Sequence, residues 1–427
     1  MGCDLRKFAL YVVMAALAAL PGLVLRFTAT HFSPLLDAFV AGIAILGAGF
    51  MLSWGVEAAE EHVSRGLALA VLALITVLPE YVVDLYYAFQ AGRQPGSEYV
   101  QFAAANMTGA NRLLVGFGWP LIVLLYWWRS GKRSVELHRD NAVEVSFLAL
   151  GSLYSFVIVL KGQIDWFDLV ALFGLFAAYL WRLGKLPRDD DDEDEETEVG
   201  PAAALAQLPR RHQYTIIAAL AIFAGLIIVV EAQPFAESLI GAATALGVNK
   251  FLLIQWVSPL AGEAPEIIIT ILFTLALRPT YALGALISDK INQWTLLVGT
   301  LPLVYSLGAG KLLALPLDAR QHEEFFLTAA QSLFAVALLM RLQFSLPSAL
   351  ILLTLFVSQL TVAFVVQHDE ARTIVLLTWF AWLYLALAAA LFWANRVRLL
   401  ESLRFGLFNR QAVARGREVL RAGQKRS

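Results

Sequence analysis

Two proline–glutamate pairs lie inside long apolar stretches, one in each half of the chain. They are Pro79-Glu80 and Pro265-Glu266. A carboxylate in hydrocarbon costs about 2.5–3.5 kcal/mol on insertion scales. A proline inside a helix also leaves the carbonyl four residues earlier without its hydrogen-bond donor. Each half therefore offers an acid beside free backbone oxygens at membrane depth, an arrangement that suits a desolvated cation.

Each pair has a second acid on the same helix face. Asp84 lies four residues after Glu80, and Glu263 lies three residues before Glu266, spacings that bring side chains together on a helix. Two neighbouring carboxylates resist being ionised at the same time, so Glu263 with Glu266 is a candidate proton carrier. Asp84 either extends an ion path or lies near the outer interface of the membrane.

Polar and charged residues follow each pair. They are Asn106, Asn111 and Arg112 in the first half and Asp289 and Lys290 in the second. We expect the two asparagines to face the site, the alternative being hydrogen bonds between helices. Asp289 is either an ion or proton site or the partner of a neighbouring base such as Lys290.

The charges of this set favour a cation as the ligand. Four acids (Glu80, Glu263, Glu266 and Asp289) face two bases (Arg112 and Lys290), which leaves a formal charge of −2 if all are ionised. The bases would compete with a cation for the carboxylates. We therefore expect a site at which a cation or a proton exchanges against a built-in positive charge.

Composition places these residues in a membrane. Of the 427 residues, 59% are hydrophobic and 15% charged, against about 25% charged in ordinary soluble domains. An integral membrane protein follows, with the lipid bilayer as its surroundings. No zinc-type Cys/His spacing, Walker loop or Gly-x-Ser-x-Gly element occurs. We expect no cofactor, no catalytic residue, no nucleic-acid partner and no enzymatic activity, and the sequence leaves the oligomeric state open.

Membrane-length apolar stretches define the expected elements, because a span needs about 20 mostly apolar residues. About twelve transmembrane helices are expected, at residues 8–27, 35–58, 66–90, 99–127, 141–160, 165–183, 214–246, 250–277, 281–307, 325–340, 347–366 and 372–395. Lys and Arg gather after the second, fourth, eighth, tenth and twelfth of these, a bias that marks cytoplasmic loops. We therefore expect both termini in the cytoplasm of a bacterial-type plasma membrane.

A polar stretch divides the apolar sequence into two similar halves. It holds nine acids among residues 189–198, a composition typical of a solvated linker. The expected order is an extra N-terminal helix (1–34), a first repeat (35–184), the acidic cytoplasmic linker (185–213), a second repeat (214–366), an extra C-terminal helix (367–395) and a basic cytoplasmic tail (396–427). Five spans per repeat give the copies opposite orientations, so the predicted fold is an all-α polytopic membrane protein with two inverted five-helix repeats.

The motifs resemble the alpha repeats of the sodium/calcium exchanger superfamily. Those repeats carry a Gly-Thr-Ser-x-Pro-Glu element on one helix and a Gly-Asn-x-x-Gly-Ser-Asn-like element on the next. Here the first repeat reads Ile75-Thr76-Val77-Leu78-Pro79-Glu80 and Ala105-Asn106-Met107-Thr108-Gly109-Ala110-Asn111, and the second reads Ala261-Gly262-Glu263-Ala264-Pro265-Glu266 and Gly284-Ala285-Leu286-Ile287-Ser288-Asp289-Lys290. The duplicated Pro-Glu, at a matching place in each half, is the specific part of the resemblance.

The resemblance assigns the role of principal ion ligands to Glu80 and Glu266. It carries the ligand role over to Thr76, Asn106 and Asn111 as well, and it sets Glu263 and Asp289 at polar positions of the second repeat. Hydroxyl groups are fewer than in the family motif, and Arg112 and Lys290 are added. Because calcium takes six to eight oxygen ligands, this set looks less like a calcium cage than the family pattern does.

The register between the repeats stays open beyond the Pro-Glu pairs. Aligning residues 113–116 with 296–299 pairs Asn106 with Asp289, whereas aligning Ala105 with Gly284 pairs Ala110 with Asp289.

These observations predict a secondary-active cation antiporter of the sodium/calcium exchanger type. Ions or protons would compete for the buried carboxylates while the site is exposed to either side in turn, with Na⁺, Ca²⁺, K⁺ or H⁺ as transported substrates. One alternative is a proton-coupled antiporter for monovalent cations. A second, of a different class, is an intramembrane lipid-modifying enzyme, which would not require a Pro-Glu pair in each half.

Overall fold

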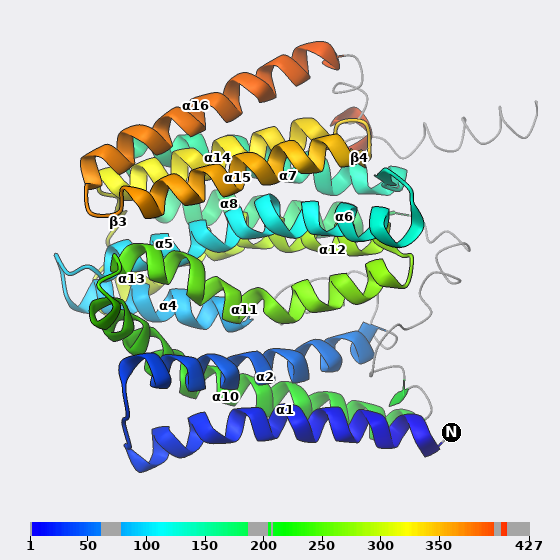
Figure 1. Ribbon diagram of the computed structural model, residues 1–427, viewed down its shortest axis with the longest axis vertical. Coiled ribbons are helices and arrows are strands. Elements are labelled where there is room, and N and C mark those ends of the chain that lie inside the picture. The colour runs from blue at the N-terminus through cyan, green and yellow to red at the C-terminus, as the bar shows by residue number, and fades with distance from the viewer. Residues whose placement is uncertain (1, 61–77, 187–203, 206–207, 397–402, 408–427) are drawn as a thin grey trace, which may run out of the picture.

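The protein is a layered bundle of long helices, seen here in a computed structural model that describes residues 2–60, 78–186, 204–205, 208–396 and 403–407. The helices lie side by side, with α1, α2 and α10 at one edge and α16 at the other (Figure 1). Nine helices in the described part are long and apolar enough to cross a membrane by length and composition. α4, α14 and the rod formed by α12 and α13 are not among those nine.

Helices occur at all twelve expected positions in the described part of the chain, the third being described from Leu78 onward. In the first half they are α1 (Gly2–Thr28), α2 (Pro34–Glu60), α4 (Leu78–Arg93), α5 (Tyr99–Leu113), α6 (Trp119–Ser130), α7 (Ala142–Lys161) and α8 (Trp166–Leu183). In the second half they are α10 (Arg210–Leu246), α11 (Lys250–Leu275), α12 (Pro279–Asn292), α13 (Val298–Ala309), α14 (Ala319–Leu339), α15 (Leu346–Val365) and α16 (Glu370–Ala394).

Two expected helix starts were wrong. The first helix was expected at 8–27, but α1 begins at Gly2. The tenth helix was expected at 325–340, but α14 begins at Ala319. Asp318 caps this start, because its carboxylate accepts from the backbone N–H of Gln321 while the Gln321 side chain accepts from the backbone N–H of Asp318. The apolar pattern does not include the first two turns because they hold polar residues, and Arg320, Gln321, Glu323 and Glu324 among these are buried.

Two π-helical turns decide the register of the repeats. The turn η1 (Leu114–Gly118) joins α5 to α6, and η4 (Gln293–Leu297) joins α12 to α13. Because such turns are rare, they mark equivalent positions in the two rods. Setting Leu114 against Gln293 pairs Ala110 with Asp289, which is the second of the two alignments left open by the sequence.

The short strands show that the repeats are inverted. β1 (Ser134–Glu136), before α7, pairs with β4 (Gln343–Ser345), after α14. β2 (Gln163–Ile164), after α7, pairs with β3 (Leu315–Pro316), before α14. α7 and α14 occupy equivalent places in the two halves, so β1 corresponds to β3 and β2 corresponds to β4. β3 and β4 lie at opposite ends of the bundle (Figure 1). Because β1 pairs with β4, the equivalent strands β1 and β3 also lie at opposite ends.

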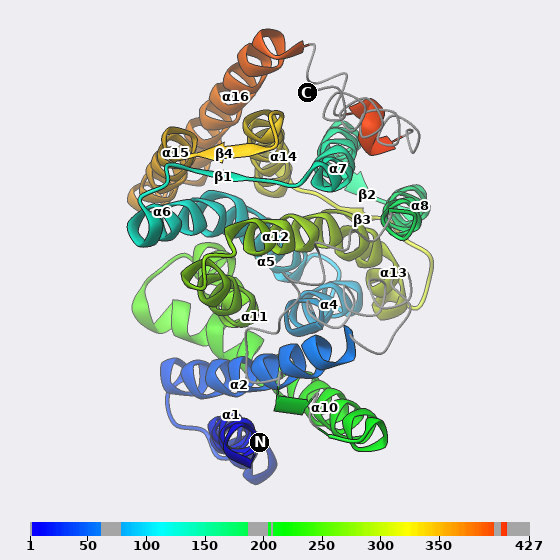
Figure 2. The ribbon, with the colours of Figure 1, turned by 90° about the vertical axis from the view of Figure 1, so that its right-hand side faces the viewer.

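Two separate apolar cores hold the layers together. The smaller core joins α1, α2 and α10 through buried residues such as Ala15, Met51 and Ile228. The larger core runs from α4 to α16. Seen along the helices, α4 and α11 lie between α2 on one side and α5 and α12 on the other (Figure 2). The two helices that carry the Pro-Glu pairs are therefore in the interior of the bundle.

Candidate functional site

The two Pro-Glu helices approach each other at small residues. A Cβ added to Gly262 of α11 would lie 3.5 Å from both the backbone nitrogen and the Cβ of Glu80 on α4. On the other side, a Cβ added to Gly49 of α2 would come within 2.7 Å of Pro265. Glycines therefore let α2, α4 and α11 pack closely enough to bring the acids of both repeats together.

Buried carboxyl groups meet at this crossing. Glu80, Glu263 and Glu266 are all buried, and Glu263 is close enough for its charge to act on the carboxyl group of Glu80. Two neighbouring buried carboxyl groups resist being ionised at the same time. Asp289 is half-buried and close enough for its charge to act on Glu263 and Glu266.

Asp84 extends the cluster along α4. It is fully buried inside the bundle. Asn106 of α5 donates to its Oδ1 at 2.9 Å. This bond holds the Asn106 amide toward α4, where the sequence motif expected it.

Several oxygens of the cluster are buried and receive no hydrogen bond from a nitrogen or hydroxyl donor within the described residues. They are both carboxylate oxygens of Glu80, Oε2 of Glu266, Oδ2 of Asp84 and the side-chain oxygens of Asn106 and Asn111. Burying a polar oxygen without a partner is costly. A set of such oxygens from both repeats is what a proton or a desolvated cation would satisfy.

No ready-made metal cage is present in the described part of the chain. No group of three or more carboxylate, histidine or cysteine side chains is arranged there to hold a metal ion. A cation bound at the cluster would therefore take part of its oxygens from amides and backbone carbonyls.

Lys290 brings a basic side chain to this interior. Its side chain is fully buried, and its Nζ donates to the backbone oxygen of Asn111 at 3.2 Å and lies 4.8 Å from the ring centre of Trp294. Among the described residues no carboxylate forms an ion pair with Lys290, so the expected alternative of an Asp289–Lys290 pair is wrong. Asn111 turns its side-chain nitrogen to the carbonyl of Met107, at 2.8 Å.

Arg112 was expected among the charge partners of the cluster, and the structure corrects this. Its guanidinium forms an ion pair with Glu324 of α14. Gln255 of α11 donates to the same carboxylate at 2.8 Å. The polar residues before 325 predict a loop, so Glu324 does not stand out in the sequence; the pairing follows from the contacts between α5, α11 and α14.

Other second-repeat groups went unnoticed in the sequence. Gln293, in η4, donates to Glu263, and Tyr81 donates to Oδ1 of Asn292 at 2.9 Å. A polar residue inside an apolar stretch was the available signal for both. Thr76 lies outside the described residues, as do the acidic residues 189–198 and most of the basic tail.

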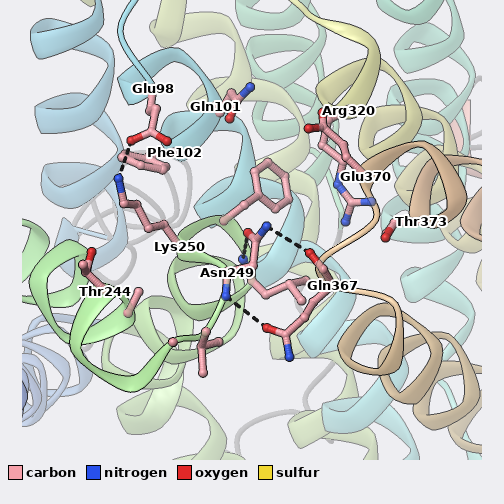
Figure 3. Close-up of a pocket in the computed structure, with 15 residues that line it drawn as sticks. Glu98, Gln101, Phe102, Thr244, Asn249, Lys250, Arg320, Gln367, Glu370 and Thr373 are labelled. Carbon is pink, nitrogen blue, oxygen red and sulfur yellow. Dashed lines mark hydrogen bonds and ion pairs between the residues drawn. The ribbon is translucent and has the colours of Figure 1, made fainter.

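A cavity of about 380 Å³ lies apart from this cluster, where the ends of α5, α10, α11, α14 and α16 come together (Figure 3). Lys250 pairs there with Glu98 at 2.7 Å, and the Asn249 side chain and backbone N–H bond to Gln367 at 3.3 and 3.0 Å. None of the expected ion ligands lines this cavity, although the buried Arg320 does.

Comparisons with known proteins agree with this architecture. The family model described as "Sodium/calcium exchanger protein" matches residues 34–184 and 216–365. The crystal structure of an H⁺/Ca²⁺ exchanger named CAX is 39% identical, with a TM-score of 0.86, over 94% of this chain and 98% of that chain. Comparison with curated proteins gives no significant match.

Two more distant structures share the fold. The structure of native YfkE matches with a TM-score of 0.59 and 12% identity, over 83% of this chain and 99% of that chain. The sodium–calcium exchanger NCX_Mj, soaked with sodium and strontium ions, matches with a TM-score of 0.51 and 15% identity, over 76% of this chain and 97% of that chain. At these identities the likeness concerns the fold alone.

Proposed function

Because the chain belongs to the sodium/calcium exchanger family, we propose that it is an antiporter that exchanges calcium ions for protons at the buried acidic cluster. Membership of this family supports a cation transporter in a membrane. It lends no support to the alternative of a lipid-modifying enzyme. The choice of protons as the counter-ion draws support from the 39% identity with the H⁺/Ca²⁺ exchanger. The burial of Glu80 beside Glu263 supports the same choice, because neighbouring buried carboxyl groups favour protonation of one of them.

The unpartnered buried oxygens carry this proposal. Glu80 and Glu266 would be the main ligands, assisted by Asn106, Asn111 and Asp84, with Thr76 as a further candidate. A cluster that keeps its negative charge is expensive to move through a low-dielectric interior. Binding of calcium or of protons neutralises it, so only an occupied site passes readily between the two sides. That difference couples the flow of one ion to the return of the other.

The proposed arrangement of the chain follows the repeats. Residues 35–184 and 214–366 would form the two inverted halves, and 1–34 and 367–395 would add one helix each. The linker 185–213 and the tail 396–427 would lie with both termini in the cytoplasm, because the basic residues gather there.

A proton-coupled antiporter for Na⁺ or K⁺ is the second candidate. It is favoured by one observation, the absence of three converging metal-ligating side chains in the described residues, since calcium requires more oxygen ligands than a monovalent cation does.

Ion flux decides between these two functions. The protein in liposomes is expected to take up ⁴⁵Ca²⁺ when an opposing pH gradient is imposed, and calcium addition is expected to drive protons the other way. Gradients of Na⁺ and K⁺, imposed one at a time, should not replace the pH gradient. Proton movement driven by Na⁺ or K⁺ but not by Ca²⁺ would establish the second candidate instead.

Replacing Lys290 by methionine is expected to strengthen calcium binding. A positive charge on Lys290 interacts electrostatically with Glu80. Among the described residues no ion pair neutralises that charge. Removing a positive charge beside the carboxylates removes its repulsion of the cation, so the calcium KM should fall about tenfold or more. Lys290→Arg, which keeps the charge, is the control for ⁴⁵Ca²⁺ uptake. An unchanged KM in Lys290→Met would show that the built-in charge does not compete with the ion.

A further inference from the structure

A second buried charge network lies beside the acidic cluster, where α5, α11 and α14 pack together. Arg112 pairs with Oε2 of Glu324, and Arg320 pairs with Oε1 of the same carboxylate. Glu323 lies 3.5 Å from Arg320. Two arginines and two glutamates make the network neutral as a whole, and all four side chains are buried.

Glu324 holds Arg112 in a defined place. The guanidinium of Arg112 is bonded to Glu324 and packs over the ring of Trp256, 5.0 Å from its centre. Gln255 donates to Glu324 at 2.8 Å and lies 3.5 Å from the hydroxyl of Thr108. The carboxylate is thus fixed by groups from two helices, and it fixes the arginine on the side of α5 that faces α14.

Arg112 is also a close neighbour of the acidic cluster. It follows Asn111, whose backbone oxygen binds Lys290, and its charge acts on Lys290. Glu324 balances this charge, while Glu323 is paired with Arg320. Without Glu324 the guanidinium of Arg112 would be an uncompensated positive charge beside the cluster, and an unpaired buried charge is strongly unfavourable.

We propose that Glu324 is a positioning residue for the cation site: by binding Arg112 it holds that guanidinium toward α14 and balances its charge, so that the charge does not oppose a cation at the neighbouring acidic cluster. The cluster then retains the negative charge that a cation needs. The inference rests on the proposed function, and it adds a residue outside the Pro-Glu motifs that sets the affinity of the site.

The test is the calcium KM of Glu324→Gln, measured by ⁴⁵Ca²⁺ uptake into liposomes from purified protein that elutes as a single species. Loss of the Glu324 charge releases Arg112, so the KM is expected to rise at least tenfold. Adding Arg112→Gln to the same chain removes the competing charge and should return the KM to within about twofold of the unsubstituted protein. Glu98→Gln, which breaks an exposed ion pair with Lys250, is the control and should leave the KM unchanged.

A purely structural role predicts a different pattern. Glu324→Gln would then give less folded protein, while the molecules that do fold would keep their calcium KM, and this result would overturn the proposal. Failure of Arg112→Gln to restore the KM would overturn it as well. If Glu324→Gln does not fold, Glu324→Asp serves instead, since the shorter side chain cannot reach Arg112, Gln255 and Arg320 together, and the same rise and rescue are expected.

Transport by the unsubstituted protein distinguishes failure of the proposed function from failure of the proposed role of Glu324. If it moves no calcium against protons, the proposed function is wrong. If it does so and the Glu324 variants keep its KM, only the role of Glu324 is wrong.

Discussion

Glu80→Gln and Glu266→Gln are each expected to lower cation exchange at least a hundredfold while leaving the protein folded. Glutamine keeps the shape of the side chain but can be neutralised by neither a proton nor a cation. Neither carboxylate forms an ion pair among the described residues, so neither substitution leaves a buried base without its partner. The measurements are ⁴⁵Ca²⁺ uptake driven by a pH gradient and the melting temperature of the purified protein.

Two further variants make this test specific. Glu370→Gln removes a carboxylate from the exposed start of α16 and should exchange at the unsubstituted rate. Glu80→Asp keeps the charge with a shorter reach and should retain partial activity. Normal exchange rates in either glutamine variant would remove Glu80 or Glu266 from the ion site.

Gly109→Ala is expected to prevent assembly of the folded bundle. A Cβ at Gly109 of α5 would overlap the backbone oxygen of Gln255 on α11. Backbone atoms cannot turn aside as a flexible side chain does, so the two helices would have to separate. Overpacking of this kind costs about 1–3 kcal/mol or more, and here it also disturbs the contact that holds Gln255 against Glu324. The yield of monodisperse protein after extraction measures the effect.

Gly174→Ala is the matched control. Gly174 lies inside α8, and a Cβ there would meet no atom within 4 Å. Because alanine favours helices over glycine by about 1 kcal/mol, this variant should fold at least as well as the unsubstituted chain. Equal yields for the two variants would mean that α5 and α11 do not pack as closely as the structure indicates.

Local properties of the sequence were sufficient to predict the helices and to single out Glu80 and Glu266 as candidate ligands. Long apolar stretches indicate membrane helices. Glu80 and Glu266 are conspicuous because acids are rare in such stretches. The family likewise followed from short motifs. In each case the signal depends on neighbouring residues alone, so no knowledge of packing was required.

Polar residues were the source of the errors. The first two turns of α14 looked like a loop because Arg320, Glu323 and Glu324 interrupt the apolar pattern. Their charges are tolerated inside the bundle because they satisfy one another and Arg112. Hydropathy counts each residue separately and therefore cannot recognise charges that cancel between distant helices.

The sequence alone therefore determined which residues are chemically out of place in a membrane. Only the tertiary structure decided which of them meet: Glu80 with Glu263 across the halves, and Arg112 with Glu324 instead of with the cluster. The physical reason is that electrostatic partners are set by distance in space. In an inverted repeat, helices separated by more than a hundred residues lie in direct contact.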